Sequence, residues 1–216
     1  PEAKPMDRRL TALLAAIGLI SLGLAGTSGF AQTKSEPVIE LSLATFAGGC
    51  FWCVEADFDK IDGVAETISG FMGGTTKNPT YQQVVRGNTG HLEVVQIKYD
   101  PKKVSYEYLV RAFFRSVDPY DDGGQFCDRG ATYRTAIFTH SEQQREIAER
   151  VKAALEKDGA QKQPFVTRIL PASEFTAAED YHQDFFKKSP GRYYSYRAGC
   201  GRDRRIEQIW GKKVTN

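Results

Sequence analysis

Short apolar stretches that favour strands alternate along the chain with longer stretches whose apolar residues recur at helical spacing. The first apolar stretch ends at a Gly-Gly turn, and beyond it Phe51, Val54 and Phe58 fall on one helical face. The predicted strands are residues 41–47, 64–71, 92–99, 133–139 and 165–170, and the predicted helices are residues 50–62, 81–85, 105–117, 141–159 and 176–187. This alternation predicts a layered α/β domain. An irregular tail is expected after Pro190, ending in a short turn over 206–210.

The first part of the chain has the pattern of an export signal. Two arginines precede an apolar run over residues 10–26, and small residues precede a cleavage point after Ala31. This pattern predicts a secretory signal peptide over 1–31, in which residues 1–5 are extra N-terminal residues. An uncleaved membrane anchor is the alternative, because the run approaches the shortest length that spans a bilayer.

After the signal we expect a flexible segment over 32–40 and a single domain over 41–216. Export places the protein in the periplasm or an equivalent oxidising compartment. The formal net charge is +2, so the charge balance does not favour nucleic-acid binding.

One predicted strand carries an acidic residue on its apolar face. Glu93 shares this face with Val95 and Ile97, whereas Gln96 and Lys98 on the other face indicate contact with water. A carboxyl group that loses water without gaining a cation has a raised pKa. Glu93 is therefore a candidate proton donor near neutral pH. The alternative is a glutamate at a strand end that points into solvent.

A cysteine lies where a predicted strand gives way to a predicted helix. Cys50 stands in the first helical turn, where free N–H groups and the positive end of the helix dipole gather. Such a position stabilises the thiolate, so we expect a lowered pKa for this thiol. Phe51 and Trp52 follow directly and put an apolar wall beside the sulfur. The pattern indicates a reactive cysteine in a pocket for something small, apolar and sulfur-containing.

Several segments together resemble the A-type methionine sulfoxide reductases. Gly49-Cys50-Phe51-Trp52, with Glu55 following, is similar to the active-site signature of that family. Further similar blocks, in the same order, are Thr89-Gly90-His91-Leu92-Glu93-Val94-Val95, Asp118-Pro119, Gly124-Gln125-Phe126, Asp128-Arg129-Gly130, Tyr133-Arg134-Thr135-Ala136-Ile137-Phe138 and Ala178-Glu179-Asp180-Tyr181-His182-Gln183. The resemblance extends over residues 44–210.

The resemblance implies a fold and a set of residue roles. The fold is a two-layer α/β (α+β) sandwich with a mixed β-sheet and a ferredoxin-like core. Cys50 is implied as the nucleophile that attacks the sulfoxide sulfur, and Glu93 as the proton donor to the sulfoxide oxygen. The implied substrate-binding residues are Phe51, Trp52, Tyr81, Asp118 and Tyr133.

The resemblance also implies what the protein acts on and with. The implied substrate is the S epimer of methionine sulfoxide, free or in oxidised proteins, and the product is methionine. The enzyme is expected to be a monomer with no bound cofactor and no bound metal. The expected reductant is an external thioredoxin-like dithiol, which reduces the disulfide that resolves the Cys50 sulfenic acid.

Three cysteines are candidates for the resolving thiol. Cys200 lies in a segment similar to the mobile C-terminal segment of the family, and Arg202 beside it favours the thiolate. Cys53 forms a C-x-x-C pair with Cys50 and stands where many family members carry glycine. Cys127 lies in the long loop before the predicted strand over 133–139, as a relay member or an inert thiol. Cys200 is the first choice and Cys53 the second, and a relay between them is also open.

Other functions remain open from the cysteines alone. An exported thiol–disulfide oxidoreductase would use only Cys50 and Cys53. A four-cysteine zinc site would need a second paired spacing, which Cys127 and Cys200 lack. An exported binding domain would hold the four cysteines in two structural disulfides, for which three pairings exist.

Overall fold

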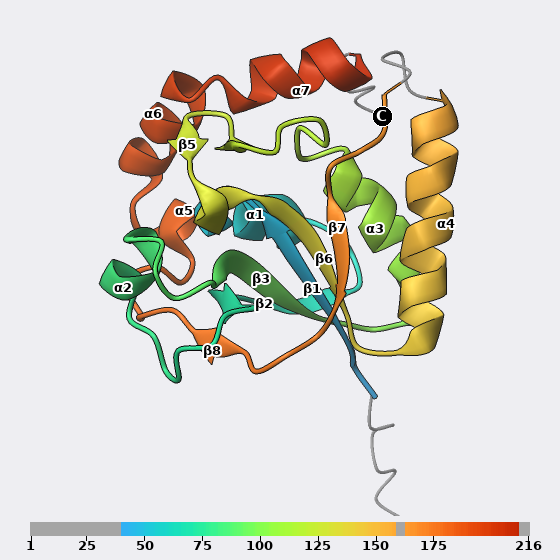
Figure 1. The fold of residues 1–216 in the computed structure, drawn as a ribbon, viewed down its shortest axis with the longest axis horizontal. Helices are drawn as coiled ribbons and strands as arrows, with labels where there is room; N and C mark the ends of the chain where they lie inside the picture. Colours follow the sequence, from blue (N-terminus) through green and yellow to red (C-terminus); the bar gives the residue numbers. More distant parts are fainter. Residues whose placement is uncertain (1–39, 159–162, 212–216) are drawn as a thin grey trace, which may run out of the picture. The chain divides into compact units, whose positions relative to one another are not determined.

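Six strands form one mixed sheet against which the longer helices pack (Figure 1). The computed structural model describes residues 40–158 and 163–211. The elements in chain order are β1 (Ser42–Gly48), α1 (Phe51–Phe58), β2 (Val64–Met72), α2 (Tyr81–Val85), β3 (Leu92–Tyr99), α3 (Tyr106–Phe114), β4 (Gly124–Gln125), β5 (Asp128–Arg129), a 3-10 turn η1 (Ala131–Tyr133), β6 (Thr135–Thr139), α4 (Glu142–Asp158), β7 (Arg168–Pro171), β8 (Thr176–Ala177), α5 (Phe185–Lys188), α6 (Pro190–Gly199) and α7 (Arg202–Trp210).

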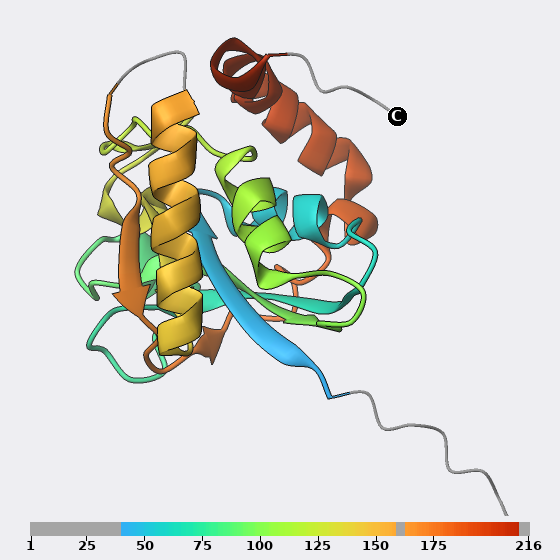
Figure 2. The same cartoon turned by 90° about the vertical axis from the view of Figure 1, so that its right-hand side faces the viewer.

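The sheet order identifies the core arrangement. The strands run β7-β6-β1-β3-β2-β8, and every neighbouring pair is antiparallel except β6 with β7. The four central strands, connected through α1 and α3, form the β-α-β-β-α-β unit of ferredoxin-like folds. The predicted mixed sheet with a ferredoxin-like core is therefore confirmed. Figure 2 shows α3 and α4 side by side, consistent with their mutual contacts.

Strand β3 divides its side chains between two apolar clusters as its alternation predicts. Val95 and Ile97 join the main core, which also contains residues of α1, α3 and α4. Leu92 and Val94 join a smaller cluster on the opposite face of the sheet. Glu93 lies on the main-core side at the start of the strand.

Two predicted helix starts are built as expected. The Ser105 hydroxyl accepts a hydrogen bond of 3.1 Å from the backbone N–H of Tyr108 at the start of α3. The Ser141 hydroxyl accepts one of 3.2 Å from Gln144 at the start of α4. The Gln144 side chain then accepts from the backbone of His140, so the cap differs by one residue from a standard capping box.

The predicted helix over residues 176–187 is wrong. Thr176 and Ala177 instead pair with Phe71 and Gly70 as an edge strand beside β2. The following residues form turns, and the only helical part is α5. Asp184 has a φ of +52°, a left-handed conformation that no helix interior permits. Pairing with an existing sheet edge therefore overrides the local helical pattern.

The predicted irregular tail is also wrong, because α6 and α7 are regular helices. Pro190 occupies the first turn of α6, where its missing N–H costs nothing. Gly201 separates the two helices with a φ of +66°. The Arg197 guanidinium donates to Asp57 and Asp203, so contacts with distant residues stabilise a stretch whose own composition is weakly helical.

Some expectations fall outside the described part of the chain. The signal peptide over 1–31 and the segment over 32–40, apart from its last residue, are not among the described residues. Within residues 40–158 and 163–211, no helix combines the length and the apolar character needed to cross a bilayer.

Candidate active site

Two glycines shape the turn that carries Cys50. A side chain on Gly48 would place its Cβ 2.8 Å from a methyl group of Val54. Gly49 has a φ of +79°, and a Cβ there would lie 2.5 Å from the Cβ of Gln125. The backbone can therefore bring Cys50 to the N-cap of α1 only with glycine at both positions. The thiol is free and 7% exposed.

Glu93 reaches this turn from the neighbouring strand. Its Oε2 accepts a hydrogen bond of 3.0 Å from the backbone N–H of Phe51. The side chain is 2% exposed, and burial raises the pKa of Glu93 to about 8, to which the charges of Asp128 and Cys53 contribute. The carboxyl group is therefore protonated at neutral pH, as the position on the apolar strand face predicts.

The two thiols of the C-x-x-C pair interact with each other. Burial raises the pKa of Cys50, and the neighbouring Cys53 and Glu93 act in the same direction. The pKa of Cys53 is lowered by a hydrogen bond with the Cys50 thiol and by the positive charges of Arg202 and Arg197. The expected lowering of the Cys50 pKa is therefore wrong for the ligand-free site. Loss of water, followed by the interaction with the Cys53 thiol, outweighs the effect of the helix terminus on the Cys50 pKa.

Two aromatic side chains follow Cys50 in the first turn of α1. Phe51 is buried and packs 5.9 Å from Phe71 between ring centroids. Trp52 stacks almost parallel on Phe185, with 3.8 Å between ring centroids. These contacts fix both rings directly after Cys50 along the chain, and their role as an apolar wall for a substrate stays a prediction.

Tyr81 and Tyr133 come together in front of Glu93. A hydrogen bond joins the two hydroxyl groups, and burial raises the pKa of Tyr81 to about 12, with further contributions from Glu93 and Cys50. The pKa of Tyr133 is raised for the same reasons. Both phenols are therefore neutral and can donate hydrogen bonds. The backbone N–H of Tyr81 also donates to Oε1 of Glu179, which anchors α2 to this position.

Asp118 lies in the long loop and contacts Arg205, Tyr120 and Gln125. Its Oδ2 accepts a hydrogen bond of 2.6 Å from Nε of Arg205, and its Oδ1 accepts from the backbone of Tyr120. Its backbone N–H donates to the side chain of Gln125. These contacts order the long loop and attach α7 to it, and the substrate-binding role of Asp118 stays a prediction.

Asp128 and Tyr196 are site residues that the sequence interpretation missed. The Tyr196 hydroxyl donates to Oδ2 of Asp128 and also interacts with the Cys50 thiol. Burial raises the pKa of Asp128, and its charge acts on both Glu93 and Tyr133. The Asp-Arg-Gly block contained a signal for Asp128. No local signal identified Tyr196, since its segment was expected to be irregular.

His182 is a third residue that the interpretation missed. Its Nδ1 accepts a hydrogen bond of 3.0 Å from the indole N–H of Trp52, and its ring lies 4.3 Å from that of Tyr81. The side chain is 2% exposed, and burial lowers its pKa. His182 is therefore neutral with its proton on Nε2, and it positions the aromatic wall. It stands in the Ala178–Gln183 block, which contained the signal for it.

Most of the chain matches one protein family. The family model described as peptide methionine sulfoxide reductase matches residues 42–214. The chain belongs to this family. It is thus an oxidoreductase, a peptide-methionine (S)-S-oxide reductase.

Individual reductases show the same relationship. The sequence is 51% identical over 171 residues to peptide methionine sulfoxide reductase MsrA of Bacillus licheniformis, covering 79% of this chain and 94% of that protein. It is 52% identical over 177 residues to MsrA 2 of Rhizobium meliloti, covering 81% and 86%.

Solved structures share the fold. The reduced form of Mxr1 from Saccharomyces cerevisiae aligns with a TM-score of 0.67 at 30% identity, covering 73% of this chain and 90% of that one. Methionine sulfoxide reductase A of Corynebacterium diphtheriae aligns with a TM-score of 0.63 at 36% identity, covering 69% and 76%.

The four cysteines of this reductase form two different pairs. Cys50 and Cys53 are free and buried, whereas Cys127 and Cys200 form a disulfide. This distribution does not fit a four-thiolate zinc site or two structural disulfides. The Cys127–Cys200 bond, called the outer disulfide below, attaches the end of α6 to the loop before η1, near β5 (Figure 1).

Arg202 links the outer disulfide region to the reductase's Cys50 turn. Its guanidinium is buried, donates at 3.2 Å to the carbonyl oxygen of Gly48 and at 2.8 Å to that of Ser116, and lies over the ring of Phe126. The start of α7 is therefore attached to the backbone just before Cys50.

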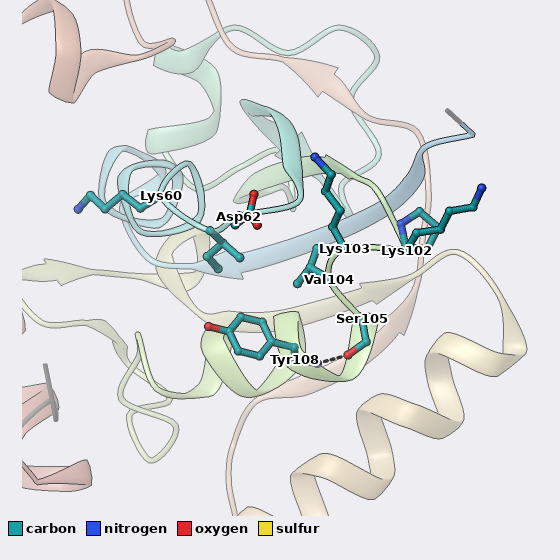
Figure 3. A pocket seen from close by; sticks show the side chains of 9 residues that line it. Lys60, Asp62, Lys102, Lys103, Val104, Ser105 and Tyr108 are labelled. Atoms are coloured by element: carbon teal, nitrogen blue, oxygen red, sulfur yellow. Dashed lines mark hydrogen bonds between the residues drawn. The ribbon is translucent and has the colours of Figure 1, made fainter. Parts of the chain in front are cut away.

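A separate cavity of about 600 Å³ lies between the end of α1 and the start of α3 (Figure 3). Lys60, Lys102, Lys103 and Tyr108 are among the residues that line it. Its lining contains no cysteine and none of the residues that surround Cys50, so it is not part of the reductase active site.

Proposed function

We propose that this reductase converts S-epimer methionine sulfoxide, free or within oxidised proteins, to methionine with Cys50 as nucleophile and Glu93 as proton donor. The observation that carries the proposal is the hydrogen bond from the backbone N–H of Phe51 to Glu93. This bond holds a protonated carboxyl group beside a buried thiol. A thiol can attack an electrophilic sulfur, and a neutral carboxyl group can protonate the oxygen that leaves it.

The chemical step moves the sulfoxide oxygen. The Cys50 sulfur attacks the sulfoxide sulfur while Glu93 gives a proton to the sulfoxide oxygen. The substrate leaves as methionine, and the oxygen remains on Cys50 as a sulfenic acid. The proton that the Cys50 thiol loses replaces the one that Glu93 gives. The net reaction therefore converts a thiol and a sulfoxide into a sulfenic acid and a thioether.

The surrounding residues hold the substrate. Phe51 and Trp52 contact the S-methyl group, and the neutral hydroxyls of Tyr81 and Tyr133 donate hydrogen bonds to the sulfoxide oxygen. An apolar wall on one side and two donors on the other distinguish the methyl group from the oxygen, which gives the site its preference for one epimer at sulfur.

A disulfide then resolves the sulfenic acid, and an external dithiol restores the thiols. Cys200, Cys53 and Cys127 are the candidates for the resolving cysteine. The external reductant is a thioredoxin-like protein, and the chemistry uses no bound cofactor.

We also propose that the protein is exported. The apolar run over 10–26 and the small residues before Ala31 support cleavage in transit to the periplasm. Sequencing the N-terminus of protein from a periplasmic fraction tests this, with Gln32 as the expected first residue. Recovery of the uncleaved chain in the membrane fraction would support the anchor instead.

Stereoresolved consumption of methionine sulfoxide with dithiothreitol tests the activity. Loss of the S epimer alone is the expected result, and loss of neither epimer would overturn the proposal. Insulin reduction is the matched measurement for the alternative thiol–disulfide oxidoreductase. Faster insulin reduction than sulfoxide reduction would favour that alternative, because its chemistry needs neither Glu93 nor the aromatic wall.

A further inference from the structure

We propose that Cys53 resolves the Cys50 sulfenic acid. We further propose that Cys127 and Cys200 form a second redox-active pair, which the external dithiol reduces and which then reduces the Cys50–Cys53 disulfide. The inference rests on the proposed role of Cys50 as nucleophile. It replaces the first sequence-based choice, Cys200, as the direct resolving cysteine.

Cys53 lies one helical turn after Cys50, and the two thiols interact. Cys50 is the N-cap of α1, and the backbone N–H of Cys53 donates to its carbonyl oxygen at 3.1 Å. Helical residues three apart have Cβ atoms about 5–6 Å apart, and a disulfide requires a Cβ separation of about 4 Å. A small adjustment at the helix end closes this gap, as in other C-x-x-C pairs.

Buried positive charge makes Cys53 an effective attacking thiol. Arg202 and Arg197 both stabilise its thiolate, and the hydrogen bonds of Arg202 go to the carbonyl oxygens of Gly48 and Ser116. Those acceptors are neutral, so they leave the charge of the guanidinium available to an adjacent thiolate.

Cys200 is not a free thiol in this structure. Its sulfur is bonded to Cys127. One turn earlier in α6, Tyr196 donates to Asp128, and two residues later Arg202 is fixed to the backbone before Cys50. Cys200 becomes a thiol only after an external dithiol has reduced its bond to Cys127, whereas Cys53 is already free one helical turn from Cys50.

The two pairs differ in their access to a protein reductant. Cys53 is 1% exposed, whereas Cys127 is exposed. The outer disulfide opens to a cavity of about 490 Å³, whose lining includes Phe126 and Arg204. A methionine side chain is long and slender and can enter the inner site. A cysteine sulfur stands one methylene from its backbone, so a partner protein can attack only the outer disulfide.

The electrons balance in three exchanges. First, the Cys53 thiol attacks the Cys50 sulfenic acid, forming an inner disulfide and releasing water. Second, the reduced outer dithiol attacks the inner disulfide, so Cys50 and Cys53 return to thiols while Cys127 and Cys200 become the disulfide seen in the structure. Third, the external dithiol reduces that disulfide and is itself oxidised.

A double variant, Cys127→Ser with Cys200→Ser, tests both parts in the full-length protein. Without external reductant, the pre-reduced wild type is expected to form two methionines per chain and to retain no free thiol. The double variant is expected to form one methionine per chain, with Cys50 and Cys53 joined in a disulfide found by peptide mapping. With dithiothreitol it turns over, but with a thioredoxin-type protein its rate falls at least tenfold.

A different result would contradict each part of the proposal. A double variant that forms one methionine but leaves a dimedone-reactive sulfenic acid and a free Cys53 would overturn the resolving role. Undiminished turnover with the protein reductant would overturn the proposed electron-transfer role of the Cys127–Cys200 pair. Absence of any methionine from the pre-reduced wild type would instead contradict the proposed function. Adding Cys53→Ser to the double variant is the matched control, since it is expected to form one methionine and to accumulate the dimedone adduct on Cys50.

Discussion

The backbone N–H of Phe51 donates a hydrogen bond of 3.0 Å to Oε2 of Glu93. Phe51 directly follows Cys50, so the peptide unit that begins α1 also holds the carboxyl group from β3. The bond favours an ionised carboxylate, yet burial outweighs it and the pKa of Glu93 rises to about 8. The geometry thus places a protonated acid next to the thiol without adding a charge to the site.

Replacing the nucleophile should stop the reaction. Cys50→Ser is expected to abolish sulfoxide reduction, because a hydroxyl group at this site has no comparable nucleophilicity toward sulfur. Methionine formation in a single turnover is the measurement. Cys127→Ser with dithiothreitol as reductant is the control and is expected to stay active. Residual turnover by Cys50→Ser would assign the nucleophile to another thiol.

The activity should depend on the protonation of Glu93. With a pKa of about 8, the acid is available below that pH, and kcat/KM is expected to fall as the pH rises above it. Glu93→Gln should lower the rate of sulfenic acid formation at neutral pH by about 10²- to 10⁴-fold and remove this limb of the pH profile. Glu55→Gln is the control, since Glu55 is also buried but accepts from the backbone of Asp184. An unchanged single-turnover rate in Glu93→Gln would exclude the proton-donor role.

Glu93 should also make the folded state less stable at high pH. Its folded-state pKa lies above the ordinary value, so between about pH 4.5 and 8 the folded state binds more protons than the unfolded state. Stability therefore falls as the pH rises through this window. Glu93→Gln is expected to raise the free energy of unfolding at pH 9 by an amount on the order of a few kcal/mol, with little difference at pH 4. Urea unfolding of both proteins at the two pH values measures this effect, and equal stabilities at pH 9 would contradict it.

The two aspartates near the active-site loop should behave differently. Asp128 raises the pKa of Glu93 through its charge, so Asp128→Asn is expected to move the alkaline limb of the pH profile to lower pH. Asn at this position can still accept from Tyr196. Asp118→Asn should leave the profile in place and lower stability by about 1 kcal/mol, because it weakens a partly exposed pair with Arg205. A shift of the profile in Asp118→Asn alone would support the sequence-based assignment of Asp118 to the pocket.

Arg202 should contribute to stability as well as to the redox site. Arg202→Met removes the donors to the buried carbonyl oxygens of Gly48 and Ser116. Leaving buried acceptors without partners costs about 1–3 kcal/mol each. Urea unfolding should show this loss, and Arg202→Lys, which keeps the charge and one donor, should recover part of it. A fully stable Arg202→Met would show that water can replace the guanidinium.

Local sequence determined the parts of this protein that depend on neighbouring residues. The two glycines before Cys50 specify a turn that only glycine can make, and the alternation within Leu92–Tyr99 places Glu93 on the buried face. Ser105 caps its helix through a residue three positions away. The left-handed backbone at Gly49, the alternation within one strand and a cap three residues away depend on local sequence, so they can be predicted without knowing the fold.

Only the tertiary structure decided the relationships that join distant segments. Asp128 rather than Asp118 acts on Glu93, His182 holds Trp52 from 130 positions away, and Tyr196 reaches the site from a helix whose own composition did not predict it. The pairing of Cys127 with Cys200 across 73 positions likewise left two other thiols together in the interior. Long-range packing sets these contacts because charge, burial and sulfur–sulfur distance depend on where the elements meet in space. The sequence alone identifies the reactive cysteine and its family, whereas the surrounding groups that control its chemistry are assembled by the fold.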